Sequence, residues 1–374
     1  MKKVMIFVLI LLGVISILFI AVFFYIKSKL PNGGGNNDIT EEYFEHFQSD
    51  APLEMKYAAP GSLETGYTEF ASDHESIGEV RVWYPTELER SDKVWPMIMV
   101  VNASGTPASS YEPFFPRLAS WGFVVVGNED GQTGNGKTAS ITLDFMLNVP
   151  SDSVLAGKID YNNMGIIGYS QGGAGAICAV TNYENGAYYK AMFTGSAAYP
   201  TLARNMGWEY DVSKVTIPYF MVAGTGKSDD SGSDPETSFG GVSPLSALVS
   251  NYTSISDNVQ KVRARAVGAE HEQMLMRSDG YMTAWMLYQL TEDKEAQPSL
   301  PVITQKSCTI ITGRTWRRIN ERENEENDTE NSNNINRHTC GSGRRSLVCP
   351  DTYADHRWYD SKAFGKYSKY CQCP

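Results

Sequence analysis

One serine in this chain has the neighbours that a hydrolytic nucleophile requires. Ser170 is the centre of Gly168-Tyr-Ser-Gln-Gly172, which follows a short apolar run and precedes a helix-like run at 174–180. In such a strand–turn–helix unit the serine hydroxyl is exposed at a sharp turn, and the glycines let strand and helix approach closely. The N–H of Gln171, at the start of the helix, is then a candidate donor to a developing oxyanion. The alternative is a glycine-rich turn in some other α/β fold.

His271 is the candidate base. A serine attacks at neutral pH only when a base removes its proton, and histidine is the usual base. His271 alone follows Ser170 within the part of the chain that alternates β-like and α-like runs; the remaining histidines are His46, His74, His338 and His356. His271 comes after a strand-like run, 262–267, which predicts a position at a strand's carboxyl end. A surface loop histidine is the alternative, and we interpret the neighbouring Glu270 and Glu272 as surface charges.

The acid of a triad is expected in the loop after the strand-like run 218–224. That loop contains Asp229, Asp230 and Asp234. An acid here would accept the Nδ1–H of His271 and stabilise its imidazolium. We favour Asp229, then Asp230, then Asp234. At least two of these residues must instead be solvated loop carboxylates of the kind that cap turns.

A second oxyanion donor is expected in the loop 102–107, which follows the strand-like run 97–101. Gly105 permits a tight turn there, and Pro107 has no N–H to donate. The N–H of Thr106 is therefore the candidate. An ordinary Gly-Pro turn is the alternative.

Three aromatic residues are weak candidates for the wall of a substrate site: Tyr169, Tyr199 and Trp208. Most such aromatics pack in the core or at its rim, so structural packing is the alternative for each. The cysteines and histidines near the C-terminus lack the spacing of metal ligands. The expected chemistry requires no metal and no cofactor.

The pattern between about 75 and 292 predicts an α/β fold. Alternating β-like and α-like runs indicate a mostly parallel sheet with helices on both faces, whose reactive groups lie at the carboxyl ends of the strands. In the run 262–267, small apolar residues alternate with Arg263 and Arg265, which predicts a half-exposed strand near an edge. The formal net charge of -11 argues against a nucleic-acid partner, because no basic face is available for phosphates.

The N-terminal segment differs from this region. Residues 1–29 contain an uncharged apolar run flanked by lysines, and the run is long enough to span a bilayer. This pattern predicts a signal anchor, with the catalytic domain outside the cytoplasmic membrane. A cleaved signal peptide is the alternative. Residues 30–55 are interpreted as a flexible linker and 56–296 as the catalytic domain.

The composition changes again at 297–374, which is rich in charge and asparagine and contains five of the six cysteines. The sixth, Cys178, is expected to be a small buried thiol. We interpret this tail as disordered or as the frame-shifted reading of an ordinary C-terminal end. A genuine cysteine-rich appendage is the alternative.

The region 60–292 resembles the α/β-hydrolase superfamily, and within it the dienelactone-hydrolase and PET-hydrolase (cutinase-like) group. The likeness rests on five segments: Gly168–Gly173, Leu118–Val126, Gly224–Gly226, Ala269–His271 and Tyr281–Met286. Two features depart from that group. The acid loop looks extended at 231–239, and dienelactone hydrolases use a cysteine nucleophile where this chain has serine.

The resemblance implies a triad of Ser170, Asp229 and His271, with Thr106 and Gln171 as oxyanion donors. We therefore expect a membrane-anchored serine esterase that cleaves small or polymeric carboxylic esters through an acyl-enzyme. A lipase, thioesterase or peptidase would use the same residues. A non-catalytic binding protein displayed on the membrane is the alternative from a different class.

Overall fold

The computed structural model describes residues 52–235, 237–297, 307–312 and 315–320. The anchor predicted at 1–29 and most of the linker predicted at 30–55 lie outside these ranges. Within the ranges, no helix combines the length and the hydropathy needed to cross a membrane.

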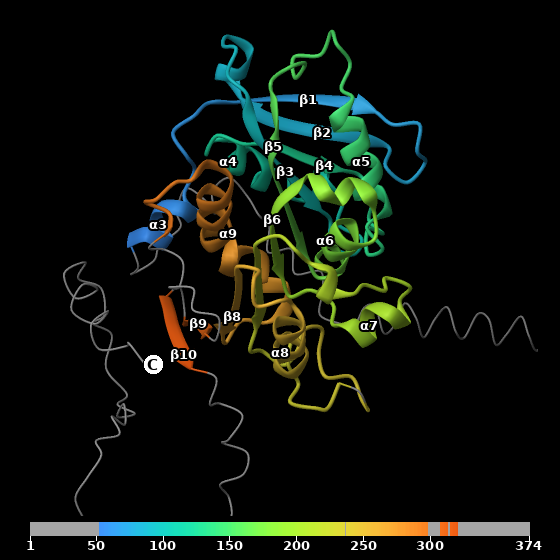
Figure 1. Cartoon of the computed structure of the whole chain (residues 1–374), viewed down its shortest axis with the longest axis vertical. Helices are drawn as coiled ribbons and strands as arrows, with labels where there is room; N and C mark the ends of the chain where they lie inside the picture. The colour runs from blue at the N-terminus through green and yellow to red at the C-terminus, as the bar shows by residue number, and fades with distance from the viewer. Residues whose placement is uncertain (1–51, 236, 298–306, 313–314, 321–374) are drawn as a thin grey trace, which may run out of the picture. The chain divides into compact units, whose positions relative to one another are not determined.

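A mostly parallel sheet forms the centre of the fold, as the sequence predicts (Figure 1). The strand order is β1-β2-β4-β3-β5-β6-β7-β8-β9-β10. The pairs β1–β2 and β2–β4 are antiparallel, and the pairs from β4 through β9 are parallel. The strands are Thr65–Ala71 (β1), Glu79–Pro85 (β2), Trp95–Val101 (β3), Val124–Asn128 (β4), Ile159–Tyr169 (β5), Tyr189–Gly195 (β6), Tyr219–Gly224 (β7), Lys261–Val267 (β8), Ser307–Thr312 (β9) and Thr315–Asn320 (β10).

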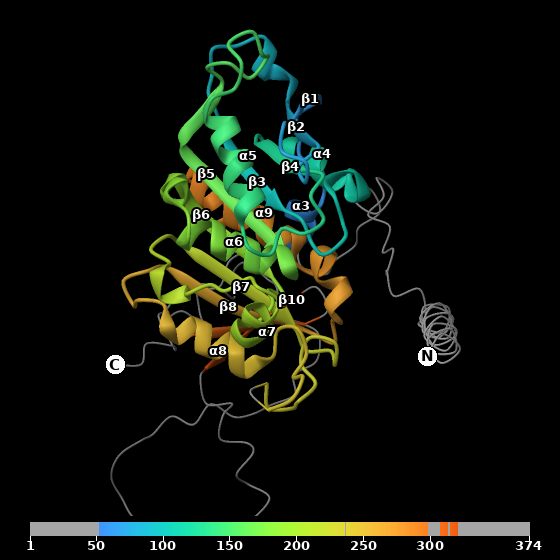
Figure 2. The same cartoon turned by 90° about the vertical axis from the view of Figure 1, so that its right-hand side faces the viewer.

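Helices cover both faces of this sheet (Figures 1 and 2). Side chains of α3, α4 and α9 share one core cluster, and side chains of α5, α6, α7 and α8 share the other. The α-helices of the described ranges are Pro52–Ala58 (α3), Phe114–Ala119 (α4), Lys137–Leu147 (α5), Gln171–Thr181 (α6), Pro200–Asn205 (α7), Leu245–Ser254 (α8) and Met274–Thr291 (α9).

The two-sided covering explains the apolar runs of the central strands. Side chains of a strand point alternately to opposite faces. In β3, Met97 and Met99 belong to one core cluster, whereas Ile98 and Val100 belong to the other. A strand buried on both faces therefore carries a continuous apolar run rather than an alternating one.

β8 is the strand that we predicted to be half-exposed near an edge, and that prediction is wrong. β8 lies between β7 and β9, and Arg263 and Arg265 are each only 5% exposed. Arg265 donates to the Gly224 carbonyl and pairs with Asp230 (Nη2 to Oδ2, 2.9 Å). The guanidinium of Arg263 lies over the Tyr252 ring, 5.5 Å from its centroid. The partners of Arg265 offset the cost of removing its charge from water. For Arg263 the ring contact is a favourable interaction, although its Nε and Nη1 have no hydrogen-bond partner among the described residues.

Two strands of the sheet lie within the tail that composition sets apart. β9 pairs with β8 in parallel, with Cys308 opposite Arg263, and β10 follows β9 in the strand order. The rest of the predicted tail, 298–306, 313–314 and 321–374, lies outside the described residues. Whether the tail is a frame-shifted C-terminal end or a genuine cysteine-rich appendage stays a prediction from the sequence.

The turn between β5 and α6 depends on the absence of two Cβ atoms. Ser170 connects the two elements with φ 55° and ψ -123°, a conformation that residues with side chains rarely adopt. A Cβ on Gly168 would overlap the carbonyl of Gly172. A Cβ on Gly172 would in turn overlap the carbonyl of Val101, at the end of β3. The helix can therefore begin close to both strands only with glycine at these positions.

Replacing Gly172 by alanine tests this close approach. The added methyl group must displace the β3 backbone, so we expect Gly172→Ala to lower the free energy of unfolding by about 3 kcal/mol or more. Urea unfolding followed by tryptophan fluorescence measures the loss. Gly157→Ala is the control, because Gly157 has a positive φ of 68° but open space around its Cα. We expect it to cost only about 1–2 kcal/mol. Equal losses for the two variants would contradict the packing argument.

Candidate active site

The structure brings together the serine, histidine and acid that the sequence singles out. Ser170 lies at the carboxyl end of β5, Asp229 in the loop after β7, and His271 at the start of the 3-10 helix η5, His271–Gln273, after β8. His271 Nε2 is 2.8 Å from Ser170 Oγ, and His271 Nδ1 is 2.7 Å from Asp229 Oδ1. The three groups form one continuous hydrogen-bonded chain at the edge where parallel strands deliver their carboxyl ends.

The backbone around Ser170 holds the strained turn in place. The Ser170 N–H donates to the carbonyl of Gly195, at the end of β6 (3.0 Å). The Ser170 carbonyl accepts from the N–H groups of Gly173 and Ala198. A sparsely populated backbone conformation persists only where surrounding contacts fix it, and contacts from two neighbouring segments do so here.

Asp229 is fully buried, and both of its carboxylate oxygens have partners. Oδ1 contacts His271, while Oδ2 accepts from the Gly224 N–H (2.7 Å) and from the hydroxyl of Ser196. These donors offset the cost of removing the carboxylate from water. Ser196 is a residue that our sequence analysis missed. It is 1% exposed and has φ 46°, and no local pattern marks it, because its partner lies 33 residues away.

The two alternative acids have other partners. Asp230 Oδ2 pairs with Arg265 and accepts from the Leu245 N–H (3.1 Å). Asp234 lies in an exposed turn, where its carboxylate accepts from the hydroxyl of Thr237 (3.2 Å). Of the three candidates, Asp229 is the one that contacts the histidine.

Gln171, which we predicted to be an oxyanion donor, lies at the start of α6. It is the first residue of α6, where a backbone N–H has no acceptor within the helix. Its side chain is fixed on both sides, because Oε1 accepts from Ser104 Oγ (3.1 Å) and Nε2 donates to the Gly131 carbonyl (3.2 Å). The loop after β3 therefore lies directly beside the start of α6.

The expected second donor, Thr106, is already engaged. Its N–H donates to the carbonyl of Ala103 within its own turn (3.1 Å), which weighs against the oxyanion role that we expected. Within the described residues, the N–H of Ala103 has no hydrogen-bond acceptor. Ala103 also lies closer in sequence to the end of β3, so we take it in place of Thr106 as the candidate.

Asn102 fixes the backbone next to Ala103. It is fully buried, and its side-chain amide donates to the carbonyls of Asn128 (2.7 Å) and Asp130 (2.8 Å). Its side-chain oxygen accepts from the hydroxyl of Tyr111 (2.7 Å). A buried amide with all these partners orients the peptide that carries the Ala103 N–H.

The three aromatic candidates for a substrate wall lie in packed surroundings. Tyr169 is buried against Phe193, and Tyr199 is buried with its hydroxyl on the Pro235 carbonyl (3.2 Å). Trp208 is partly buried against the core, close to Gly134. These contacts agree with the structural alternative for each aromatic.

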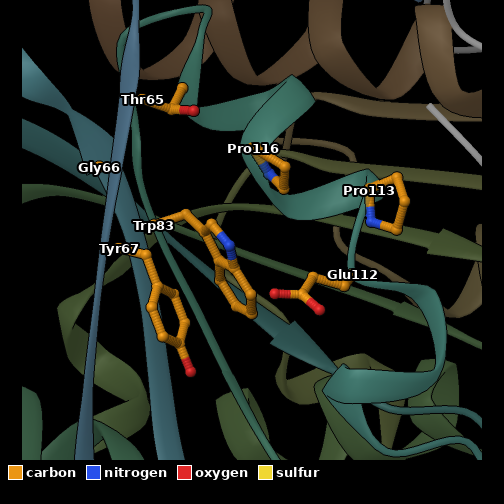
Figure 3. A pocket seen from close by; sticks show the side chains of 7 residues that line it. All are labelled: Thr65, Gly66, Tyr67, Trp83, Glu112, Pro113 and Pro116. Carbon is orange, nitrogen blue, oxygen red and sulfur yellow. The ribbon is translucent and has the colours of Figure 1, made fainter.

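A hollow of about 320 Å³ lies elsewhere, beside the edge strand β1 (Figure 3). Its lining residues are Thr65, Gly66, Tyr67, Trp83, Glu112, Pro113 and Pro116. Trp83 offers little ring surface to a ligand, because it is 4% exposed and stacks on Phe115 (4.4 Å between ring centroids). The hollow shares no residue with the Ser170 site, which remains the candidate because the reactive groups converge there.

No cluster of three or more His, Cys, Asp or Glu side chains suited to a metal ion occurs in the described part of the chain. Cys178 is buried and unpaired, and burial raises its thiol pKa to about 12. Cys178 is thus the small buried thiol that we expected, and a thiol with a raised pKa is a poor nucleophile at neutral pH.

Comparison with known proteins gives one family. The family model described as PETase, PET hydrolase-like, matches residues 49–293, which include Ser170, Asp229 and His271. No curated protein matches the chain.

Removing the Ser196 hydroxyl tests whether Asp229 depends on it. Ser196→Ala leaves a buried carboxylate oxygen with one donor fewer, so we expect the free energy of unfolding to fall by about 1–3 kcal/mol. Urea unfolding at neutral pH measures this loss. Ser213→Ala is the matched control, because Ser213 donates to Asp211 Oδ1 at an exposed site (2.6 Å). Its cost should be within about 0.5 kcal/mol. A Ser196→Ala variant as stable as the control would contradict the role of Ser196.

Proposed function

The chain belongs to the PET hydrolase-like family of ester hydrolases, and we propose that it is a serine-dependent carboxylic ester hydrolase with Ser170 as nucleophile. The observation that carries the proposal is the hydrogen-bonded chain from Asp229 through His271 to Ser170, with donor–acceptor distances of 2.7 and 2.8 Å. A nucleophile within hydrogen-bond reach of a base, which a third group orients, is the arrangement that covalent catalysis requires.

The proposed reaction proceeds through an acyl-enzyme. Ser170 Oγ attacks the ester carbonyl carbon while His271 Nε2 takes the hydroxyl proton. The tetrahedral intermediate collapses, the carbon–oxygen bond to the alcohol breaks, and His271 donates its proton to the leaving alkoxide. Asp229 holds the Nδ1–H of His271 and stabilises the imidazolium. Water, deprotonated by His271, then attacks the acyl group and releases the carboxylic acid and free Ser170.

The oxyanion of each tetrahedral intermediate would accept hydrogen bonds from the N–H groups of Gln171 and Ala103. Two observations support this pair: Gln171 begins α6, and Ala103 has an N–H without an acceptor among the described residues. Donors already fixed by the fold need not reorganise as the charge develops. The macrodipole of α6 adds to the effect, because its positive end lies at Gln171.

The surroundings of Ser170 favour a substrate that approaches from open solvent. Ser170 is half-buried, and the side chain of His271 is 21% exposed. Polymeric esters are the substrate class that the PET hydrolase-like family suggests. A lipase, thioesterase or peptidase would use the same three residues, and these are the rival substrate classes.

Ester turnover by the full-length protein and its Ser170→Ala variant tests the proposal. p-Nitrophenyl acetate, p-nitrophenyl butyrate, a longer-chain ester and an aromatic diester serve as substrates. We expect the variant to lose at least about 10³-fold in kcat, because no other hydroxyl replaces the nucleophile. We expect Asp229→Asn to lose about 10²-fold or more, because an amide neither stabilises the imidazolium nor holds His271 in the tautomer with a proton on Nδ1.

The outcomes distinguish the proposed ester hydrolase from a non-catalytic protein and from the rival substrate classes. Turnover that survives in the Ser170→Ala variant would contradict the assignment of the nucleophile. No turnover of any ester by a folded wild-type protein would favour a non-catalytic binding protein. A matched thioester and a matched peptide, assayed beside these esters, test the rival classes, and preference for either would contradict the assignment as a carboxylic ester hydrolase.

A further inference from the structure

We propose that Ser228 and Glu270 form a clamp that joins the acid loop to the histidine loop and positions His271 for proton transfer. The proposal rests on the proposed function and adds two positioning residues to it. Neither residue touches the reacting atoms, and the sequence alone led us to interpret Glu270 as a surface charge.

Three hydrogen bonds make the clamp. The Ser228 N–H donates to Glu270 Oε2 (2.9 Å), and the Ser228 hydroxyl donates to the same oxygen. The backbone N–H of His271 then donates to Ser228 Oγ (2.8 Å). The Ser228 hydroxyl is therefore both donor and acceptor, which uses its hydrogen-bonding capacity on the two loops at once.

Glu270 is fixed from its own side as well. It is the N-cap of η5, and its N–H donates to the side chain of Gln273 (3.0 Å) in a capping box. The two loops also meet through the Gly226 N–H, which donates to the Ala269 carbonyl (2.8 Å). A Cβ at Gly226 would overlap the Glu270 carboxyl group, so the carboxylate fits only against glycine.

The position of the clamp explains why it would act on proton transfer. Ser228 directly precedes Asp229, and Glu270 directly precedes His271. The acid and the base are thus linked twice, once through their side chains and once through the residues before them. The His271 ring must keep distances of 2.7 and 2.8 Å to two partners on different loops. A tether on its own backbone N–H limits the displacement that would break either contact.

The ionisation of Glu270 is consistent with this role. The hydrogen bonds from Ser228 lower the pKa of Glu270 below its usual range, and the charge of Lys227 adds to the effect. A lowered pKa in the folded state means that folding stabilises the ionised carboxyl group. Glu270 is therefore a carboxylate, and an acceptor, at neutral pH. Its contribution is lost only as the pH falls through the lowered pKa.

Steady-state kinetics of four variants in the full-length protein test the clamp. Ser228→Ala and Glu270→Ala each remove one side, and we expect kcat to fall about tenfold with KM nearly unchanged. We expect the double variant to be no worse than the worse single variant, because both act on one contact. Glu270→Gln keeps an oxygen that can accept both bonds from Ser228, so its kcat should lie between that of Glu270→Ala and the wild type.

Glu272→Gln is the matched control, an exposed acid on the other side of His271, and its kcat should stay within about twofold of the wild type. Thermal unfolding confirms that each variant is folded at the assay temperature. A wild type without turnover would overturn the proposed function and the positioning role together. An active wild type whose clamp variants match Glu272→Gln, raise KM alone or combine additively would overturn the clamp and leave the proposed function intact.

Discussion

The structure around Ser170 depends on one steric constraint: β5, α6 and the end of β3 meet with no Cβ atoms between them. Gly168 and Gly172 let the strand turn into the helix within one residue, and that residue takes φ 55°. The strained backbone of this turn is confined to Ser170, but it decides where the proposed nucleophile lies. The half-buried serine lies at the carboxyl edge of the sheet, and the helix begins directly after it. The loop after β3 is held against the helix start. A looser turn would separate the nucleophile from the N–H groups proposed for the oxyanion.

The other half of the site comes from two loops that follow β7 and β8. Because these strands are parallel neighbours, their carboxyl ends bring Asp229 and His271 to the same edge. Asp229 is buried and accepts hydrogen bonds from Ser196 and the Gly224 N–H, whereas the side chain of His271 is partly exposed to solvent. The burial of each residue suits its proposed role. The acid needs a fixed orientation, and the base must exchange protons with substrate and water.

Much of this arrangement could be predicted from the sequence, because its signals are local. The glycines around Ser170 indicate the sharp turn between strand and helix, and the alternation of β-like and α-like runs indicates the parallel sheet. Neither signal needs tertiary information. Chain order and strand ends indicate His271 and the loop of the acid, in which Asp229 is the favoured of three aspartates. What the sequence could not give depends on contacts between distant segments. Asp230 is held by Arg265, 35 residues away, and Glu270 meets Ser228 across 42 residues. The burial of β8 likewise depends on β9, which pairs with it. No residue pattern shows that the N–H of Thr106 donates to the Ala103 carbonyl within its own turn.

We propose that one hydroxyl of this chain, that of Ser170, is activated for attack on an acyl carbonyl. Reaction of the full-length protein with a fluorophosphonate, followed by mass spectrometry of the digest, tests it most directly, because the reagent bonds only to an activated serine and reports its position. We expect a single adduct on the peptide that contains Ser170, formed more slowly when Asp229 is replaced by Asn. An adduct on another serine, or ester hydrolysis by a protein that forms no adduct at Ser170, would contradict it.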